Sequence, residues 1–225
     1  MNSRAFSRLT VSIAAVLLGF TTVAFAGPPL ICHRIEIGQA KSLPPVDLNY
    51  QKGSGTYDVK NLTRDTLAIL ESNAPVLVRM ETLRRATIYA RQDPQVAKEL
   101  LTRLHERAAE SGAGNSGALA WFDAGYLAEA YKQWMGKGDP NPAKGLDGYG
   151  WVKKAISMRG SDPEMEYAAA LISLSVSERE HNDHMEKAMA GAKADPLLAQ
   201  NLASQFKRVA TTGTQTQPIA EELRK

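Results

Sequence analysis

Apolar residues recur at three- and four-residue spacing over most of the chain after residue 57, a pattern that predicts amphipathic helices. The clearest stripe contains Val96, Leu100, Leu104 and Ala108. Proline, glycine and capping residues such as Asp58 interrupt these stripes where one helix is expected to end and the next to begin. The pattern therefore predicts helices over 58–72, from 75 onward, and over 95–110, 118–135, 151–158, 164–177, 183–194 and 196–210.

The segments on either side of this helical region have a different composition. Residues 27–57 are interrupted by proline and glycine, yet they retain apolar side chains such as Ile35 and Leu43. We therefore expect an extended arm that packs along a helical body. The last residues, 211–225, contain the polar run TTGTQTQ and are expected to form a flexible tail. The helical domain itself is predicted to span 58–210.

The dipeptide Asp-Pro occurs at 93–94, 162–163 and 195–196, at intervals of 69 and 33 residues. Asp is a preferred N-cap and Pro a preferred first helical residue, so each dipeptide predicts a helix start. Because 69 is close to twice 34, the spacing agrees with a helix-pair repeat of about 34 residues, which is the period of tetratricopeptide repeats.

The chain thus resembles a degenerate tetratricopeptide-like array, or a related α-solenoid, over roughly 75–210. Part of the tetratricopeptide motif is present as Trp121, Gly125 and Tyr126, although their spacing differs from that of the motif. The resemblance implies an all-α fold in which antiparallel helix pairs stack as a short array, with the extended N-terminal arm attached. An irregular helical bundle with the same intervals is the alternative.

The N-terminus has the organisation of a secretory signal peptide. Arg4 and Arg8 provide a positive start, and residues 11–20 are apolar. Ala24-Phe25-Ala26 forms a small-x-small cleavage site. The apolar core is shorter than the roughly 20 residues of a membrane-spanning helix. We predict cleavage of the signal, 1–26, and export to the periplasm or out of the cell; an uncleaved anchor and a lipoprotein acylated at Cys32 are the alternatives.

Charge and cysteine content narrow the classes of partner. The chain has 27 Lys and Arg residues against 24 Asp and Glu, and the predicted signal removes two arginines and no acid. A nearly neutral mature chain has no overall attraction to nucleic acid, and no second apolar run is long enough to span a membrane. Cys32 is the single cysteine, so the chain can form no internal disulfide. The opening of the mature chain, 27–44, resembles that of some exported bacterial proteins without an assigned activity, which transfers no function.

Three short motifs contain residue types found in known sites, and each of them is incomplete. Residues 112–117 match G-x-G-x-x-G but follow a helical pattern instead of a strand, so a turn between helices is expected. His181 and His184 lie near one helix face; a metal or small-ligand carrier using this pair is the alternative to a solvated helix start. Cys32 and His33 are adjacent, and adjacent residues of an extended chain point in opposite directions. The sequence therefore predicts no metal, no cofactor and no catalytic residue.

Aromatic residues concentrate in and just after the helix predicted at 118–135. Most such side chains belong to a helical core, but exposed members would form a groove that holds a peptide, because aromatic residues dominate binding hot spots. We therefore predict an exported helical scaffold that binds a protein or peptide partner without catalysis; an unrecognised helical enzyme of the hydrolase class is the alternative. The predicted partner-binding residues are Trp121, Tyr126, Tyr131, Trp134, Tyr149 and Trp151.

Overall fold

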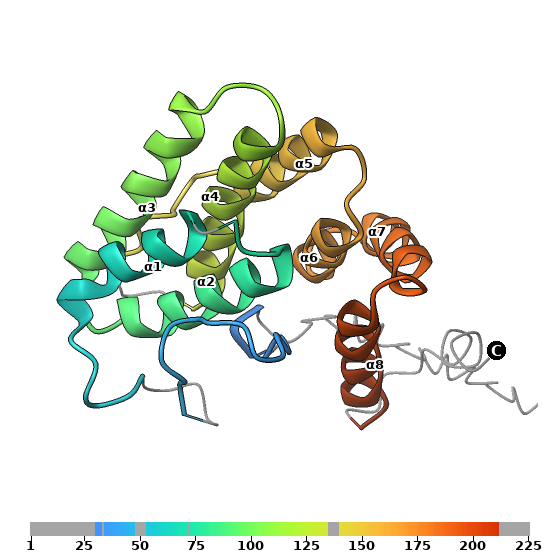
Figure 1. The fold of residues 1–225 in the computed structure, drawn as a ribbon, viewed down its shortest axis with the longest axis horizontal. Coiled ribbons are helices and arrows are strands. Elements are labelled where there is room, and N and C mark those ends of the chain that lie inside the picture. Colours follow the sequence, from blue (N-terminus) through green and yellow to red (C-terminus); the bar gives the residue numbers. More distant parts are fainter. Residues whose placement is uncertain (1–29, 33, 48–52, 72, 135–139, 212–225) are drawn as a thin grey trace, which may run out of the picture.

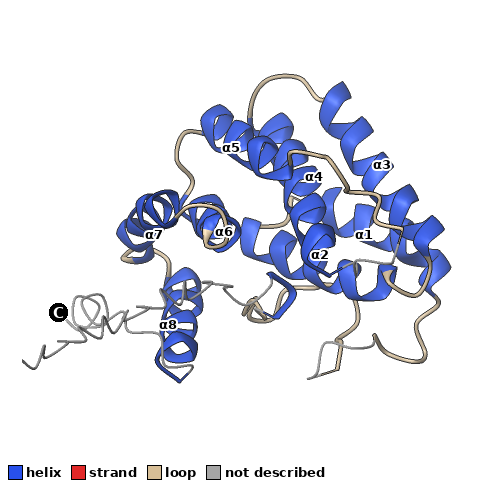
Figure 2. Ribbon diagram, turned by 180° about the vertical axis from the view of Figure 1, so that it is seen from behind, coloured by secondary structure: helices blue, strands red, loops and turns tan. Residues whose placement is uncertain are grey.

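The part of the chain that the structure describes is all-α, as predicted. This computed structural model describes residues 30–32, 34–47, 53–71, 73–134 and 140–211, with the side chains of all of these except 134 and 206–211. The predicted signal peptide and its cleavage site, His33, and 212–225 of the predicted tail lie outside the described residues. Figure 2 shows helices joined by loops and no strand among the described residues. No helix among them is long and apolar enough to cross a membrane.

Within these residues the chain forms eight α-helices, which follow the predicted amphipathic stripes, and two short 3-10 helices, the first of which lies in the arm predicted to be extended. In chain order they are η1 (Leu30–Cys32), η2 (Val59–Asn61), α1 (Leu62–Glu71), α2 (Val76–Ala90), α3 (Pro94–Glu110), α4 (Asn115–Trp134), α5 (Gly148–Arg159), α6 (Pro163–Ser173), α7 (Glu178–Ala192) and α8 (Pro196–Thr211).

Aspartate side chains begin several of these helices. Asp93, Asp162 and Asp195 precede the prolines that open α3, α6 and α8. Each carboxylate accepts hydrogen bonds from two backbone N–H groups of the first turn. The three helix starts predicted from Asp-Pro are therefore confirmed. Asp58 also caps a helix as predicted, with the difference that the short helix η2 comes before α1.

The clearest difference between prediction and structure is at α7. The sequence pattern predicts this helix over 183–194, whereas it begins at Glu178. Ser177 caps it by accepting a hydrogen bond from the N–H of Glu180. Serine followed three residues later by glutamate is the spacing of a capping box, so a local signal for this start exists in the sequence. The preceding helix α6 ends correspondingly early, at Ser173.

Helix α4 lies at the centre of the fold and packs against α2, α3 and α5 (Figure 1). Its two apolar faces predict a helix that is covered on two sides. This is confirmed, because Phe122 and Tyr126 on one face and Tyr131 on the other are fully buried. The contact with α5 depends on glycine. A Cβ on Gly125 would lie 2.6 Å from the carbonyl oxygen of Gly148, which begins α5 three residues before the predicted start at 151.

Consecutive helices also pack on one another through the second half of the chain, α5 on α6, α6 on α7, and α7 on α8 (Figure 1). Helix α2 reaches α6, which joins the two halves. Packing between neighbouring units is what a helical repeat requires. The tetratricopeptide-like stacking itself stays a prediction.

The predicted extended arm packs along this helical body. It runs beside α2 (Figure 1), and the side chain of Asn201 on α8 binds the main chain of Glu36. The Asn201 side chain accepts a hydrogen bond from the N–H of Glu36 at 2.8 Å and donates one to its carbonyl oxygen at 2.9 Å. Four apolar side chains anchor the N-terminal segment in the core: Leu30, Ile31, Ile35 and Leu43.

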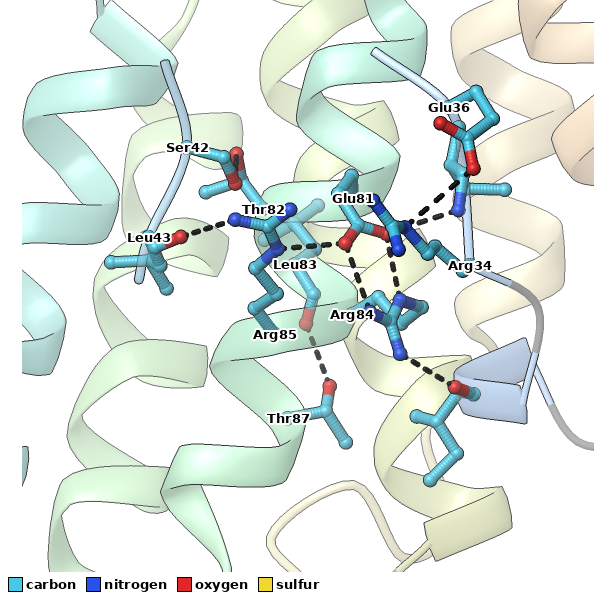
Figure 3. Close-up of polar contacts among 12 residues, drawn as sticks. Arg34, Glu36, Ser42, Leu43, Glu81, Thr82, Leu83, Arg84, Arg85 and Thr87 are labelled. Carbon is cyan, nitrogen blue, oxygen red and sulfur yellow. Dashed lines mark hydrogen bonds and ion pairs between the residues drawn. The ribbon is translucent and has the colours of Figure 1, made fainter. Parts of the chain in front are cut away.

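Charged side chains of α2 hold the backbone of the arm (Figure 3). The buried carboxylate of Glu81 accepts a hydrogen bond from the N–H of Ile35 at 3.1 Å and pairs with Arg84 and Arg85. Each arginine also donates to a backbone carbonyl of the N-terminal segment. Burial raises the pKa of the Glu81 carboxyl, but the hydrogen bonds and charges of the two arginines outweigh burial, so this pKa lies below its ordinary value.

Candidate functional site

Two adjoining cavities open where four turns between helices meet, those joining α1 to α2, α3 to α4, α5 to α6 and α7 to α8. The first cavity has a volume of about 280 Å³ and lies between the α1–α2 and α3–α4 turns. The second has a volume of about 560 Å³ and extends to the α5–α6 and α7–α8 turns. Asn73, Asn115 and Leu119 line both cavities, so together they form one cleft.

An ion pair in the interior forms the wall of the first cavity. Arg79 of α2 lines this cavity, and only 2% of its side chain is exposed. Its Nη1 lies 2.6 Å from Oδ2 of Asp123 on α4, while its other nitrogens donate to the carbonyls of Leu70 and Ala74. Arg79 thereby fixes the α1–α2 turn to α4. Burial raises the pKa of Asp123 to about 6, although the charges of Arg79 and Arg107 act in the opposite direction.

A second arginine of the first cavity is incompletely paired. Arg107 of α3 places its Nη2 3.6 Å from Oδ2 of Asp123, and about a quarter of its side chain is exposed, at 27%. Its Nη1 is buried and has no hydrogen-bond partner among the described residues, and the same holds for Oδ1 of Asp123. Buried polar atoms are nearly always hydrogen-bonded in proteins. The pair formed by Arg107 and Asp123 therefore has an unused hydrogen-bond donor and an unused acceptor next to the cavity.

Carboxyl groups and one arginine line the second cavity. Burial raises the pKa of Glu164 to about 7, the N–H of Leu77 acts in the opposite direction, and the charges of Asp162 and Asp195 raise it further. Oε2 of Glu164 accepts the hydrogen bond from Leu77 at 3.2 Å. Asp162 also pairs with Arg159 at 3.1 Å. The wall of the second cavity thus contains a carboxyl whose pKa lies well above its ordinary value.

The six predicted partner-binding aromatics do not gather in one groove. Tyr126 and Tyr131 are fully buried and Tyr149 is 8% exposed, because they pack between helices. The side chain of Trp134 lies outside the described residues. Trp121 and Trp151 are half-buried. None of the described five lines the cleft.

The two half-buried tryptophans form a separate surface cluster. Trp121 and Trp151 contact each other edge to face, with ring centroids 6.0 Å apart. His105 stacks on Trp151 at 4.7 Å, and the ammonium of Lys154 lies 3.5 Å from the Trp121 ring centroid. Each indole therefore already has a partner from its own chain. The predicted aromatic groove is not formed by these residues.

The histidine pair takes part in structural hydrogen bonds. His184 lies between Tyr149 and Glu166, with its Nε2 2.9 Å from the tyrosine hydroxyl and its Nδ1 bonded to the carboxylate. His181 instead has its Nδ1 2.8 Å from the carbonyl oxygen of Ala170. The two rings are engaged by different partners, and no group of three or more His, Cys, Asp or Glu among the described residues is arranged to hold a metal ion. A carrier built on this pair finds no support in the geometry.

Residues 112–114 of the glycine-rich segment lie between α3 and α4 as predicted, whereas 115–117 already belong to α4, which begins three residues before the predicted start at 118. Gly114 has φ +101°, a left-handed conformation that favours glycine, and it immediately precedes the first residue of α4. Asn115 follows it and faces the cleft. The segment thus begins a helix beside the cleft. Helix α3 precedes it in place of the strand that a dinucleotide-binding G-x-G-x-x-G motif requires.

Comparisons with known proteins identify no relative of this chain from which a function could be inferred. No family model matches the chain, and neither the curated proteins nor the solved structures contain a match. The sequence has little local signal for the cleft, because its walls come from four turns far apart in the chain. Arg79 and Asp123 are separated by 44 residues. The one visible signal is an aspartate in the middle of a helix that is otherwise apolar on two faces.

Proposed function

We propose that this protein is an exported, non-catalytic helical scaffold that binds a peptide segment of a partner protein in the cleft. The observation that carries the proposal is the cleft itself, which two cavities of about 280 and 560 Å³ form across four turns. The asparagine amides shared by the cavities, Asn73 and Asn115, offer donors and acceptors, and Leu119 offers an apolar contact. A peptide needs both kinds of contact, since its backbone is polar and its side chains are mixed.

The arm supports this proposal by showing how the helical body holds an extended chain. Glu81 and Asn201 bind backbone N–H and carbonyl groups of the arm through their side chains. Such contacts are independent of the side chains of the bound segment. The same kind of contact is available from the asparagines of the cleft.

The predicted signal peptide supports a role outside the cytoplasm, in the periplasm or secreted. Mass spectrometry of the exported protein tests this part of the proposal. We expect the mass of a chain that begins at Gly27, because cleavage is predicted to follow Ala26. A mass that retains residues 1–26 would contradict this part of the proposal.

The binding proposal is tested with a library of random peptides displayed on phage, panned against the mature protein. Enriched peptides are synthesised and titrated against two matched tryptophan variants. Ala194 is exposed in the α7–α8 turn and lines the second cavity, so Ala194→Trp fills the cleft. Val176 is exposed in the α6–α7 turn and lines neither cavity, so Val176→Trp is the control. We expect Ala194→Trp to weaken binding roughly tenfold or more and Val176→Trp to leave it unchanged.

Two results would refute cleft binding. One is a library that yields no peptide with measurable affinity for the folded mature protein. The other is a peptide whose affinity is the same for both tryptophan variants, because its site would then lie elsewhere on the surface.

A hydrolytic enzyme is the second candidate, and the observation that favours it is the position of the Glu164 carboxyl in the wall of the second cavity. Burial raises its pKa to about 7, and a carboxyl with such a pKa in a cavity can act as a general acid at neutral pH. Its neighbours Asp162 and Asp195 are less available, because each accepts two backbone N–H groups at a helix start. Turnover of chromogenic esters or glycosides by the mature protein, lost in Glu164→Gln, would establish this function in place of the first.

A further inference from the structure

We infer that the first cavity is a carboxylate site, in which Arg107 and the start of α4 bind an acidic group of the peptide and the buried guanidinium of Arg79 adds positive charge. The inference rests on the proposed function, since it names the chemical class of the partner in the same cleft. Both arginines line the cavity, together with Asn115 and Ser116 of α4.

The balance of charge around the cavity favours an anion. Two guanidinium groups share a single buried carboxylate, that of Asp123, at 2.6 and 3.6 Å. Glu71 also lines the cavity, but it is exposed, where water and salt screen its charge. The group formed by Arg79, Arg107 and Asp123 therefore carries one more positive than negative charge.

The hydrogen-bonding pattern points the same way. Nη1 of Arg107 has no partner among the described residues, and the Arg107 side chain, which is 27% exposed, lines the cavity. An arginine donates five N–H bonds in a planar fork, which a carboxylate matches with two parallel bonds. A bound carboxylate would complete the pairing of Arg107 that Asp123 leaves unfinished.

The start of α4 adds a second source of attraction for an anion. The helix runs from Asn115 to Trp134, and the first N–H groups of any α-helix have no acceptor inside it. Aspartate or serine side chains cap α3, α5, α6 and α7, whereas Gly114 has no side chain to place before α4. The positive end of the helix dipole thus faces the cavity that contains the arginines.

The size of the cavity and its connection to the second one favour a carboxylate attached to a peptide. A volume of about 280 Å³ is at the small end for ligand pockets, so it suits a single residue and not a whole ligand. The rest of a peptide can continue past Asn73 and Asn115 into the second cavity. An acidic side chain and a chain terminus supply the same chemistry, and the experiment separates them.

The test follows the Nε–H signals of Arg79 and Arg107 by NMR while small probes are added to the mature protein. N-acetylalanine carries a carboxylate that represents a chain terminus. N-acetylglutamic acid α-methylamide carries only a side-chain carboxylate, because its α-carboxyl group is blocked as an amide. N-acetylalanine methylamide carries neither. We expect saturable shifts of both arginine signals with at least one carboxylate probe, and none with the neutral amide. The probe that binds more tightly identifies the source.

A matched pair of variants locates the site. Arg107→Gln removes the incompletely paired guanidinium, and we expect affinity for the carboxylate probe to fall roughly tenfold or more. Arg103 lies on the same helix with 62% of its side chain exposed, so Arg103→Gln is the control and should bind like the parent protein. The wild-type arginine signals decide the question even if Arg107→Gln does not fold.

Three results would overturn the inference: equal binding of the neutral amide, equal loss of affinity in both glutamine variants, or tighter binding of inorganic phosphate than of either carboxylate. Its failure is distinguishable from that of the proposed function. Peptides from the library that bind the cleft without an acidic group would retain the function and reject the carboxylate site. Carboxylate probes that bind while the library yields no peptide would support the carboxylate site and reject the proposed peptide-binding function.

Discussion

The partly buried carboxyl of Glu164 is expected to contribute most to the fall in stability of this protein toward neutral pH. Burial raises its pKa from an ordinary 4.5 to about 7, so the folded state holds this proton more tightly than the unfolded state does. The resulting stability is fully present below about pH 4.5 and is lost as the pH rises through about 7. Glu164→Gln keeps the shape of the neutral acid, and we expect it to flatten the fall in unfolding free energy over this range.

Urea denaturation of both proteins at intervals between pH 4.5 and 7.5 measures this effect. The carboxyl of Asp123 also has a raised pKa and is present in both proteins, so a smaller fall in the same direction remains in the variant. Identical pH profiles for the parent protein and Glu164→Gln would show that Glu164 is not responsible.

The buried ion pair of Arg79 and Asp123 is expected to make the protein unstable when one of its two charges is removed. Asp123→Asn preserves the size of the side chain but leaves the guanidinium of Arg79 in the interior without its anion. Removing one member of a buried ion pair typically destabilises a protein by about 3–5 kcal/mol. We expect a loss of this order in the free energy of unfolding, measured by urea denaturation at pH 7.

The exposed pair of Arg103 and Glu106 on α3 is the matched control. Its atoms are 3.5 Å apart, and both side chains are at least half exposed. Exposed ion pairs contribute only about 0–1 kcal/mol, so Glu106→Gln should change stability little. If Asp123→Asn were as well tolerated as Glu106→Gln, the pair would not contribute to stability in the way its burial indicates.

At the scale of helices, the contact between α4 and α5 depends on two glycines in van der Waals contact. Gly125→Ala would place a Cβ 2.6 Å from the carbonyl oxygen of Gly148 and 2.9 Å from the N–H nitrogen of Val152, which are backbone atoms that cannot rotate away. Although alanine favours a helix over glycine by up to about 1 kcal/mol, overpacking costs about 1–3 kcal/mol. We expect net destabilisation and a lower Tm by calorimetry.

Gly112→Ala is the control for this change. Gly112 lies in the α3–α4 turn, and a Cβ built there meets no atom within 4 Å. Its substitution should therefore move the Tm by much less than Gly125→Ala does. An increase in Tm for Gly125→Ala would mean that helix propensity outweighs the close approach of α4 and α5.

The beginnings of helices were predictable where a local hydrogen bond decides them. Asp93, Asp162 and Asp195 cap the helices that follow them because the acceptor and the donors are only two or three residues apart. The early start of α7 at Ser177 is equally local, and its serine–glutamate spacing is readable in the sequence. The tight contact of Gly125 with Gly148 cannot be predicted in this way, because the residues near either glycine do not indicate which helix will pack against it.

The cleft was beyond prediction for the same reason at a larger scale. Its first cavity combines Arg79, Arg107 and Asn115 from three helices, and a guanidinium becomes part of a site only when the fold brings a cavity to it. The aromatic residues show the converse. Tyr126 and Tyr131 belong to a conspicuous cluster in the sequence, but a helix covered on two sides buries them, and an aromatic side chain inside the core touches no partner.

At the scale of the whole molecule, the arm links the first helices to the last. It is held by charged side chains of α2 near Ile35 and by Asn201 of α8 at Glu36, so α8 is connected to the N-terminal half through these bonds as well as through α7. Asn201 is 2% exposed, and its amide also donates to the carbonyl of Leu197 in its own helix. The side chain is therefore oriented by α8 before it binds the arm.

Asn201→Ala removes both bonds to Glu36, which leaves an N–H and a carbonyl of a partly buried segment without these partners. The loss of a hydrogen bond in such a setting destabilises by about 1–3 kcal/mol, and we expect the free energy of local opening to fall by this order. Hydrogen exchange followed by mass spectrometry should show faster exchange in the arm and in α8 together, with α4 unaffected. Ser204→Ala, which removes a bond from Ser204 to the carbonyl of Gln200 within α8, should change only that helix. Faster exchange confined to α8 in both variants would mean that the arm does not couple the two ends of the molecule.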